Sequence, residues 1–243
     1  GAITEVGINA RGLRMDWDVH TTLAMVHTYP DGDRDFSFYR SPGADMMLRE
    51  DELDEKTLEN TRIFHFGTLS MTDPEVRAAT KKAVGIAKEN GAVISFDPNL
   101  RPPLWKSLDD AKAQTAYGLS QCDILKISDN EIQWFTGEIE FDAGICKLRE
   151  QYNIPLILLS MGKEGSRAYY KDLCVEVKPF IQESTIETTG AGDTFGACCL
   201  YHVLEYGLEN LDESKLTQML TFANAAASIV TTRKGALRVM PSR

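Results

Sequence analysis

Short apolar runs alternate with longer segments of helical periodicity through most of the chain. The most strand-like run is "PLILLSM", and the pairs Asp73-Pro74 and Asn90-Gly91 supply the start and stop signals of a helix. Strands separated by helices of this length imply right-handed βαβ crossovers, so the sequence predicts an α/β fold with a mainly parallel sheet covered on both faces. Strands are predicted at 62–68, 92–97, 122–128 and 155–161, antiparallel β structure at 166–179, and helices at 73–90, 107–120, 129–136, 142–152, 192–207 and 213–232.

A different pattern near the N-terminus predicts a β-hairpin. The apolar run "TTLAMVHTY", the turn sequence "PDGD" and the alternating run "RDFSFYR" follow one another over residues 21–40. Phe36 and Phe38 should share one face of the second strand. Because the hairpin stands apart from the main alternation, we expect a lid at 21–47 within a single domain that spans 1–243.

The composition is that of a globular protein with a polar surface. Apolar residues make up 43% of the 243 residues and charged residues 26%. The formal net charge of −10 argues against nucleic acid or an anionic membrane as a partner, since either would favour a basic face. No apolar run approaches the roughly 20 residues of a membrane span, and no signal peptide is visible. We therefore expect a cytoplasmic protein with a small-molecule ligand.

The cysteines and histidines give no sign of a metal site or a disulfide framework. The cysteines are odd in number, and none has the spacing of zinc ligands. We expect reduced and mostly buried thiols, as is usual in the cytosol. The five cysteines are Cys122, Cys146, Cys174, Cys198 and Cys199.

Three polar loops follow predicted strands. They are "DPNLRPPLW" after 92–97, "SDNE" after 122–128 and "SMGKEGS" after 155–161. In parallel α/β sheets the functional residues lie at the C-terminal ends of the strands. We expect the three loops to converge on one edge of the sheet and to form the site there.

The stretch "TTGAGD" at 188–193 places a carboxylate beside exposed backbone at the start of a predicted helix. A Gly-Ala-Gly turn that enters a helix leaves several N–H groups unpaired, and with the helix dipole these form an anion site. Asp193 would repel a resting anion, but it suits a reaction that removes a proton beside a developing negative charge. The N–H groups would stabilise a transferring phosphoryl group while Asp193 accepts the proton of an attacking hydroxyl.

On this motif alone, the alternative is a glycine-rich turn in which Asp193 merely complements the helix dipole. The spacing of a P-loop, G-x-x-x-x-G-K-[ST], is absent from the chain, so phosphate binding would be of another type. The rest of the sequence has to decide between the two interpretations.

Five segments, taken in chain order, share one resemblance. They are "DGDRDFSFYRSPGAD", "SFDPNLRPPLW", "LLSMGKEGS", "ETTGAGDTFGA" and "FANAAASIVTTRKGA". Together they resemble the PfkB carbohydrate kinase family, the ribokinase-like sugar kinases, and the first two are similar to the lid and mid-chain loop of bacterial fructokinases. The resemblance implies a three-layer α/β/α fold with a small β lid, and it runs through essentially the whole chain.

The resemblance also implies roles for the residues at matching positions. Asp193 would be the catalytic base, with the amides of Gly190, Ala191 and Gly192 forming the anion hole. Tyr39 and Arg40 on the lid would face the sugar, although Arg40 could instead be a solvated lid charge.

ATP would bind on the side of the transferring phosphoryl group that lies opposite the sugar. By the same resemblance, Asn99 and Arg101 would lie near the phosphates, although they could simply shape a proline-rich turn. The remaining nucleotide contacts implied are Ser160, Gly162 and Gly165 along the nucleotide and Asn224 beside the adenine, unless Asn224 is only a polar residue on a helix surface.

Two kinds of cation follow from the resemblance. Mg²⁺ would be held mainly by ATP phosphates and water, with Glu131 acting through water. Ser128 stands where the family's Asn-x-x-Glu motif begins with Asn, which could alter the water shell of the metal. The loops that hold a monovalent cation such as K⁺ in some relatives match Glu187, Thr189 and Gly235.

Family members carry a further N-terminal segment before the position that matches Gly1. It includes the first strand, a sugar-binding Asp and a glycine motif that reads sugar hydroxyls. We therefore expect the chain to be N-terminally truncated, and we expect the segment alone to phosphorylate sugar poorly.

The predicted function is ATP-dependent phosphorylation of a sugar hydroxyl, with fructose at its 6-hydroxyl as the leading substrate. The alternatives are 2-keto-3-deoxygluconate kinase, another sugar or nucleoside kinase of the same fold, and a nucleotide- or sugar-binding protein without catalysis. The apolar hairpin could also pair with a second lid across a two-fold axis and give a homodimer.

Overall fold

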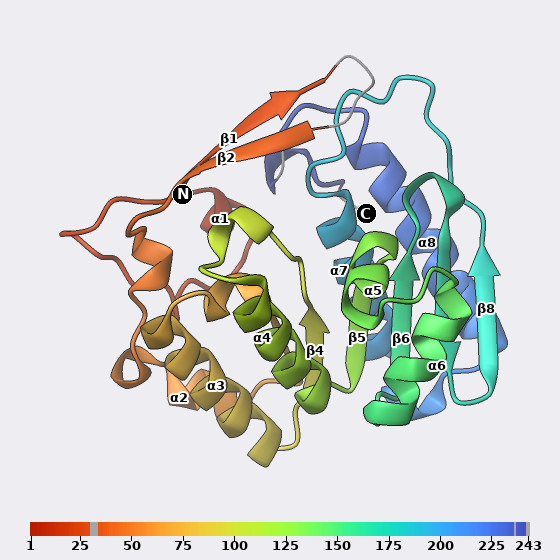
Figure 1. Ribbon diagram of the computed structural model, residues 1–243, viewed down its shortest axis with the longest axis horizontal. Coiled ribbons are helices and arrows are strands. Elements are labelled where there is room, and N and C mark those ends of the chain that lie inside the picture. The colour runs from red at the N-terminus through yellow and green to blue at the C-terminus, as the bar shows by residue number, and fades with distance from the viewer. Residues whose placement is uncertain (30–33, 236, 242–243) are drawn as a thin grey trace.

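The computed structural model describes residues 1–29, 34–235 and 237–241, and a six-stranded sheet forms its centre (Figure 1). The strand order is β3-β4-β5-β6-β7-β8. Strands β3 to β6 pair in parallel, whereas β6, β7 and β8 pair antiparallel. These strands are β3 (Ile63–Gly67), β4 (Val93–Asp97), β5 (Ile124–Ser128), β6 (Leu156–Ser160), β7 (Ser166–Tyr170) and β8 (Leu173–Val177).

Helices cover both faces of the sheet. Helices α3 to α6 lie on the face turned to the viewer in Figure 1, and α7 and α8 lie behind the sheet. The short helices α1 (Ala2–Glu5) and α2 (Glu55–Glu59) belong to the N-terminal quarter of the chain. The longer helices are α3 (Pro74–Glu89), α4 (Leu108–Gln121), α5 (Asp129–Thr136), α6 (Phe141–Gln151), α7 (Ala191–Tyr206) and α8 (Glu213–Val230).

Each central strand sends alternate side chains into two separate cores. On β5, Leu125 and Ile127 pack against the helices of the first face, and Ile124 packs beneath α7 and α8. Side chains alternate between faces along a strand, so Lys126 points to the same side as Ile124. A charged residue therefore lies in the strand face that α7 covers.

The hairpin forms a two-stranded sheet of its own, with β1 (Leu23–Thr28) antiparallel to β2 (Arg34–Tyr39). The rings of Phe36 and Phe38 stack 5.9 Å apart, as their shared face requires. In Figure 1 the hairpin lies at the end of the molecule toward which the arrows of β4, β5 and β6 point. It therefore lies on the side where the strand-end loops gather.

The predicted strands and helices are confirmed within a residue or two at each end. The turn expected from "PDGD" at 30–33 lies outside the described residues. The expectation of mostly buried thiols is wrong, because Cys146 and Cys174 are exposed and only Cys122 and Cys199 are fully buried. All five cysteines are free. No helix in the described part of the chain has the length and apolarity needed to cross a membrane.

Candidate active site

The Gly-Ala-Gly turn forms the N-terminus of α7. Gly190 is the N-cap residue and has a φ of 79°, a left-handed conformation that favours glycine. Ala191 N donates to Thr188 O at 3.2 Å, and Thr194 N donates to Gly190 O at 2.9 Å, which begins the helix. Within the described residues, the N–H groups of Gly192 and Asp193 have no backbone or side-chain acceptor.

This geometry matches an anion site in part. The free N–H groups of Gly192 and Asp193 belong to the first turn of α7, where the helix dipole adds positive potential. Of the three amides expected to form the anion hole, Ala191 N is already used in the turn, whereas no acceptor is found among the described residues for Gly190 N or Gly192 N. The Asp193 carboxylate is exposed beside them. A proton acceptor and two anion-binding donors thus share one helical turn.

A buried ion pair lies beneath this turn. Lys126 Nζ on β5 is 3.0 Å from Oδ2 of Asp97 at the end of β4, with side-chain exposures of 11% and 8%. A Cβ added to Gly192 would lie 3.3 Å from Nζ and 3.9 Å from Cε of Lys126. The lysine side chain therefore passes directly under the first turn of α7.

The charges in this group act on one another. Burial lowers the pKa of the Lys126 ammonium, but the carboxylates of Asp97, Glu131 and Asp193 outweigh it and raise that pKa above its usual value. Burial raises the pKa of Asp97 to about 6 in spite of the neighbouring Lys126. The site thus combines three carboxylates with one firmly protonated ammonium.

The loop after β4 is held by the helix that follows β5. Glu131 is buried on the first turn of α5, where Oε2 accepts from Ser128 N at 2.9 Å and from Ser128 Oγ at 2.8 Å. Its other oxygen, Oε1, accepts from Leu100 N at 2.8 Å. Asn99, at a φ of 44°, donates its N–H to Asp97 Oδ1. Ser128 with Glu131 forms a capping box, so the serine that departs from the family motif caps a helix.

Arg101 lies between this loop and the lid. Its Nη1 donates to Leu100 O at 3.0 Å, and its guanidinium is 5.7 Å from the centre of the Phe36 ring. That distance falls within the range of a cation–π contact. The mid-chain loop and the hairpin are therefore in contact, as a shared site requires.

The two lid residues expected to face a sugar differ in their surroundings. Tyr39 is 63% exposed, with its ring centre 5.2 Å from that of His20, so most of the ring is open to a ligand. Arg40 is buried, and its guanidinium donates to Asp45 Oδ2, Thr72 Oγ1 and Leu69 O. Within the described residues, the bond to Asp45 stays at the base of the lid, the bonds to Thr72 and Leu69 join that base to the segment after β3, and none reaches Asp193.

The expected nucleotide residues gather around the end of β6. Gly162 has a φ of 52° and Gly165 a φ of 100°, and a Cβ on Gly165 would lie 2.3 Å from Val177 O. Ser160 Oγ reaches Ile127 O at 3.5 Å. Gly165 is thus required by the close approach of the backbone, and the positive φ of Gly162 favours glycine there, whatever the turn binds.

Asn224 also has a structural task. Its Oδ1 accepts from Ser166 Oγ at 2.9 Å, and its Nδ2 is 3.2 Å from the carbonyls of Val177 and Lys178. These bonds fasten α8 to β7 and to the end of β8, so the interpretation of Asn224 as a simple surface residue is wrong. Its position beside an adenine remains a prediction.

The residues expected to hold a monovalent cation are brought partly together. Glu187 is buried, and its Oε1 accepts from Gly235 N at 3.0 Å. The hydroxyl of Thr189 is buried without a hydrogen-bond partner among the described residues. A buried carboxylate and an unpaired buried hydroxyl two residues further along the chain are oxygen ligands of the kind that a hard cation prefers. Elsewhere in the described chain, no group of three or more His, Cys, Asp and Glu side chains is placed to hold a metal ion.

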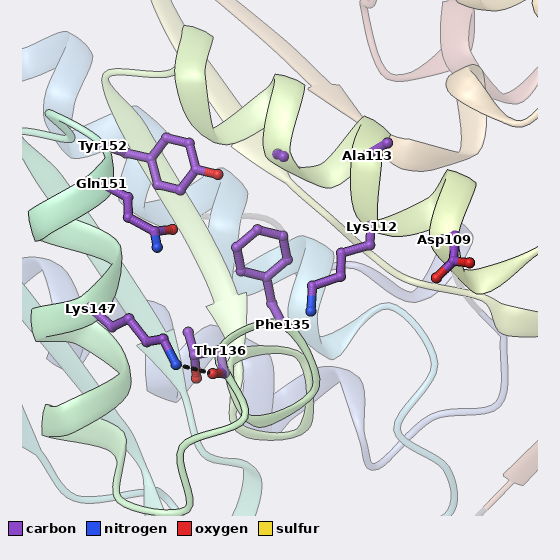
Figure 2. Close-up of a pocket in the computed structure, with 9 residues that line it drawn as sticks. Asp109, Lys112, Ala113, Phe135, Thr136, Lys147, Gln151 and Tyr152 are labelled. Atoms are coloured by element: carbon purple, nitrogen blue, oxygen red, sulfur yellow. Dashed lines mark hydrogen bonds between the residues drawn. The ribbon is translucent and has the colours of Figure 1, made fainter.

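A cavity of about 430 Å³ lies on the other side of the sheet, between α4, α5 and α6 (Figure 2). Phe135 and Tyr152 form its apolar walls, and Lys147 donates to Thr136 O at 2.6 Å at one end. Because α7 covers the opposite face, this cavity is not part of the site around Asp193.

Two residues of this site were not predicted. Asp97 was predicted only as part of the loop "DPNLRPPLW" and Lys126 only as part of the strand at 122–128, although a lysine inside the apolar run "ILKIS" is itself a signal. A charge in a strand covered on both faces needs a buried partner. The sequence could not identify that partner, because the register between β4 and β5 is set by the fold.

Comparison with known proteins identifies the family. Residues 2–243 match the model of the pfkB family carbohydrate kinases. A probable fructokinase-4 of Arabidopsis thaliana is 37% identical over 242 residues, which cover 100% of this chain and 74% of the relative. The chain therefore belongs to the pfkB family and is a carbohydrate kinase.

Solved structures agree with this assignment. Fructokinase with bound ATP from Xylella fastidiosa superposes with a TM-score of 0.86 at 28% identity, covering 99% of this chain and 76% of the other. Fructokinase from Vibrio cholerae O395, in a form with fructose, ADP and calcium ion bound, also gives a TM-score of 0.86, at 26% identity, with 98% and 76% covered. The fold is thus ribokinase-like.

Proposed function

We propose that this kinase transfers the γ-phosphoryl group of ATP to the 6-hydroxyl of fructose. The observation that carries the proposal is the turn at Gly190–Asp193, where open amides and an exposed carboxylate share the first turn of α7. Fructose is favoured as the substrate because the curated relative reported above, which matches the whole chain, is a probable fructokinase, and both solved structures reported above are fructokinases.

The chemistry follows from that turn. Asp193 accepts the proton of the sugar hydroxyl as the hydroxyl oxygen forms a bond to the γ-phosphorus. The bond between that phosphorus and the bridging oxygen of ATP breaks, and ADP leaves with the electron pair. The N–H groups of Gly190, Gly192 and Asp193 stabilise the charge on the transferring group.

ATP would lie along the strand-end loops, with its phosphates near Asn99 and Arg101. The turn that contains Ser160, Gly162 and Gly165 would line the nucleotide, with Asn224 nearest the adenine. Mg²⁺, when bound, supplies positive charge to the phosphate oxygens. Glu131 would approach the metal through water, since both of its oxygens already accept hydrogen bonds.

The lid residues would act differently from each other. Tyr39 has an exposed ring and would contact the sugar, whereas Arg40 would fix the base of the lid through Asp45. A direct bond from Arg40 to a sugar would require breaking that pair. The exposed Leu23, Met25 and Val26 on β1 would suit a second lid, so a homodimer is part of the proposal.

We also propose K⁺ as the occupant of the group formed by Glu187, Thr189 and Gly235. The support is the unpaired Thr189 hydroxyl together with the buried Glu187 carboxylate, which is bonded to Gly235 N. Such a cation would stabilise the loop that leads into the Gly-Ala-Gly turn. A cytoplasmic location fits the need for ATP and the five free thiols.

A panel of sugars tests the substrate. ATP consumption by the purified protein should be fastest with fructose, and phosphorus NMR of the product should place the phosphate on the 6-hydroxyl. Faster turnover with 2-keto-3-deoxygluconate or with a riboside would refute fructose as the substrate while leaving the kinase chemistry intact.

A further inference from the structure

The buried pair of Asp97 and Lys126 has no evident structural need for its charges. Its neighbours on the same sheet face, Ile124 and Leu158, are apolar and fully buried. Taking two charges out of water costs several kcal/mol per ion, and well-packed apolar side chains often stabilise such a position equally or better. An explanation therefore has to come from what lies next to the pair.

The pair lies against the N-terminus of α7. Lys126 Nζ would be 3.3 Å from a Cβ on Gly192, so the ammonium lies at a residue that carries an open N–H group. Asp97 anchors the ammonium at 3.0 Å. The charge and the open backbone donors are thus fixed side by side by two neighbouring strands and one helix.

The ammonium has unused hydrogen-bonding capacity. It carries three N–H donors, and across the described residues Asp97 is the single group that bonds to Nζ. With a side-chain exposure of 11%, the remaining donors have little access to water. Buried donors without a partner are unusual and point to an acceptor that binds there.

The surrounding charge indicates what kind of acceptor fits. Asp97, Glu131 and Asp193 are the carboxylates that interact with Lys126. On their own they would repel a phosphate group, and Lys126 offsets part of that repulsion. The ammonium thus makes the N-terminus of α7 more favourable to an anion in a setting that is otherwise acidic.

We propose that Lys126, anchored by Asp97, is a positioning residue for phosphoryl transfer, and that its buried charge strengthens the anion hole at Gly192 and Asp193. The inference rests on the proposed role of the Gly190–Asp193 turn. It does not depend on which sugar is phosphorylated. Lys126 acts through the turn and by its field on the transferring group, so its effect should appear in the transition state more than in substrate binding.

The first test compares Lys126→Met with Lys126→Arg. Removing the charge should lower kcat about 100-fold while KM for the sugar changes less than about threefold. Arginine keeps the charge and should recover kcat to within about tenfold of the wild type. Lys147→Met, which removes a lysine at the distant cavity, serves as the matched control and should leave kcat unchanged. A folded Lys126→Met enzyme with kcat within about threefold of the wild type would overturn the proposal.

A double variant separates this role from a structural one. Lys126→Met alone leaves the Asp97 charge buried and unpaired, which can unfold the protein. Asp97→Asn combined with Lys126→Met removes both charges and keeps an oxygen for the Asn99 N–H. The double variant should melt near the wild-type temperature, and its kcat should stay as low as that of Lys126→Met. Recovery of near-wild-type kcat would show that Lys126 only neutralises Asp97, and would overturn the proposal.

A binding measurement does not need turnover. Thermal unfolding is followed with ADP and Mg²⁺, with and without aluminium fluoride as a mimic of the transferring phosphoryl group. Aluminium fluoride should raise the melting temperature of the wild type above the value reached with ADP and Mg²⁺ alone. In Lys126→Met, ADP and Mg²⁺ should still raise the melting temperature, but aluminium fluoride should add nothing further. An increment that persists in Lys126→Met overturns the inference. If the wild type shows the fluoride-dependent rise in melting temperature but does not phosphorylate fructose, only the proposed substrate is refuted.

Discussion

Oε1 of Glu131 accepts a hydrogen bond from Leu100 N at 2.8 Å, so the helix after β5 holds the loop after β4. The same carboxylate caps its own helix through Ser128. Two of the three strand-end loops expected to form the active site are therefore locked together by one buried side chain.

Glu131→Ala should weaken both the fold and the binding of ATP. The change leaves the N–H groups of Leu100 and Ser128 without their acceptor, and we expect it to lower the free energy of unfolding by about 2–4 kcal/mol. KM for ATP should rise, since the phosphate-side loop loses its support. Urea unfolding and steady-state kinetics measure the two effects. Glu131→Gln keeps an acceptor and should be milder, and equal effects of the two variants would contradict this explanation.

Asp45→Ala should destabilise the base of the lid. It leaves the buried guanidinium of Arg40 without its ionic partner, at an expected cost of about 1–3 kcal/mol because Asp45 itself is partly exposed. Asp51→Ala is the control, since its pair with Arg49 is exposed and should contribute little. Denaturation midpoints compare the two variants. A loss no greater than that of Asp51→Ala would show that the Arg40 pair does not stabilise the lid.

Asn224→Ala should cost about 1–3 kcal/mol of unfolding free energy, because Ser166 Oγ and two carbonyl oxygens lose their partner at a buried position. Asn210→Ala removes an exposed amide and provides the comparison. If Asn224 also lies beside the adenine, the KM for ATP should rise in the first variant alone. An unchanged melting temperature for Asn224→Ala would contradict the structural role.

The stability of the protein should depend on pH through Asp97. Its folded-state pKa is raised from 3.8 to about 6, chiefly by burial, so the folded state binds a proton that the unfolded state has already released. The contribution of Asp97 to stability is therefore present below pH 4 and is lost as the pH rises toward 6, by at most about 1.4 kcal/mol per pH unit.

Asp97→Asn provides the comparison for this pH dependence. Unfolding by urea at intervals between pH 4 and pH 6 should show the wild type losing stability relative to the variant as the pH rises. A constant difference between the two proteins over that range would mean that Asp97 titrates normally in the folded state.

Much of the fold could be predicted because its signals are local. Asp73-Pro74 and Asn90-Gly91 bound α3 as expected, since capping and stop signals act within one turn of the helix. "SDNE" was interpreted as a metal motif with a substitution at Ser128. The structure shows that the same four residues form a capping box, which is a local pattern that the sequence also contained.

Other parts of the site depend on contacts between distant segments. Lys126 meets Asp97 and Gly192 only because β4, β5 and α7 are packed together, and no spacing in the chain encodes that meeting. Arg40 was expected to face the sugar, but its donors are taken by Asp45, Thr72 and Leu69. A polar residue on a lid can serve the fold or a ligand, and the choice is made by neighbours that are remote in sequence.

The most direct test of the proposed chemistry is the turnover of Asp193→Asn. Asparagine preserves the size of the side chain but cannot accept the proton of the sugar hydroxyl, so kcat should fall at least about 100-fold. The affinity for ADP, measured by calorimetry, should stay close to that of the wild type. Asp109→Asn changes an exposed aspartate in the first turn of α4 and should leave kcat unaltered. If the Asp193→Asn enzyme turns over at the wild-type rate, Asp193 is not the catalytic base and the proposed mechanism is contradicted.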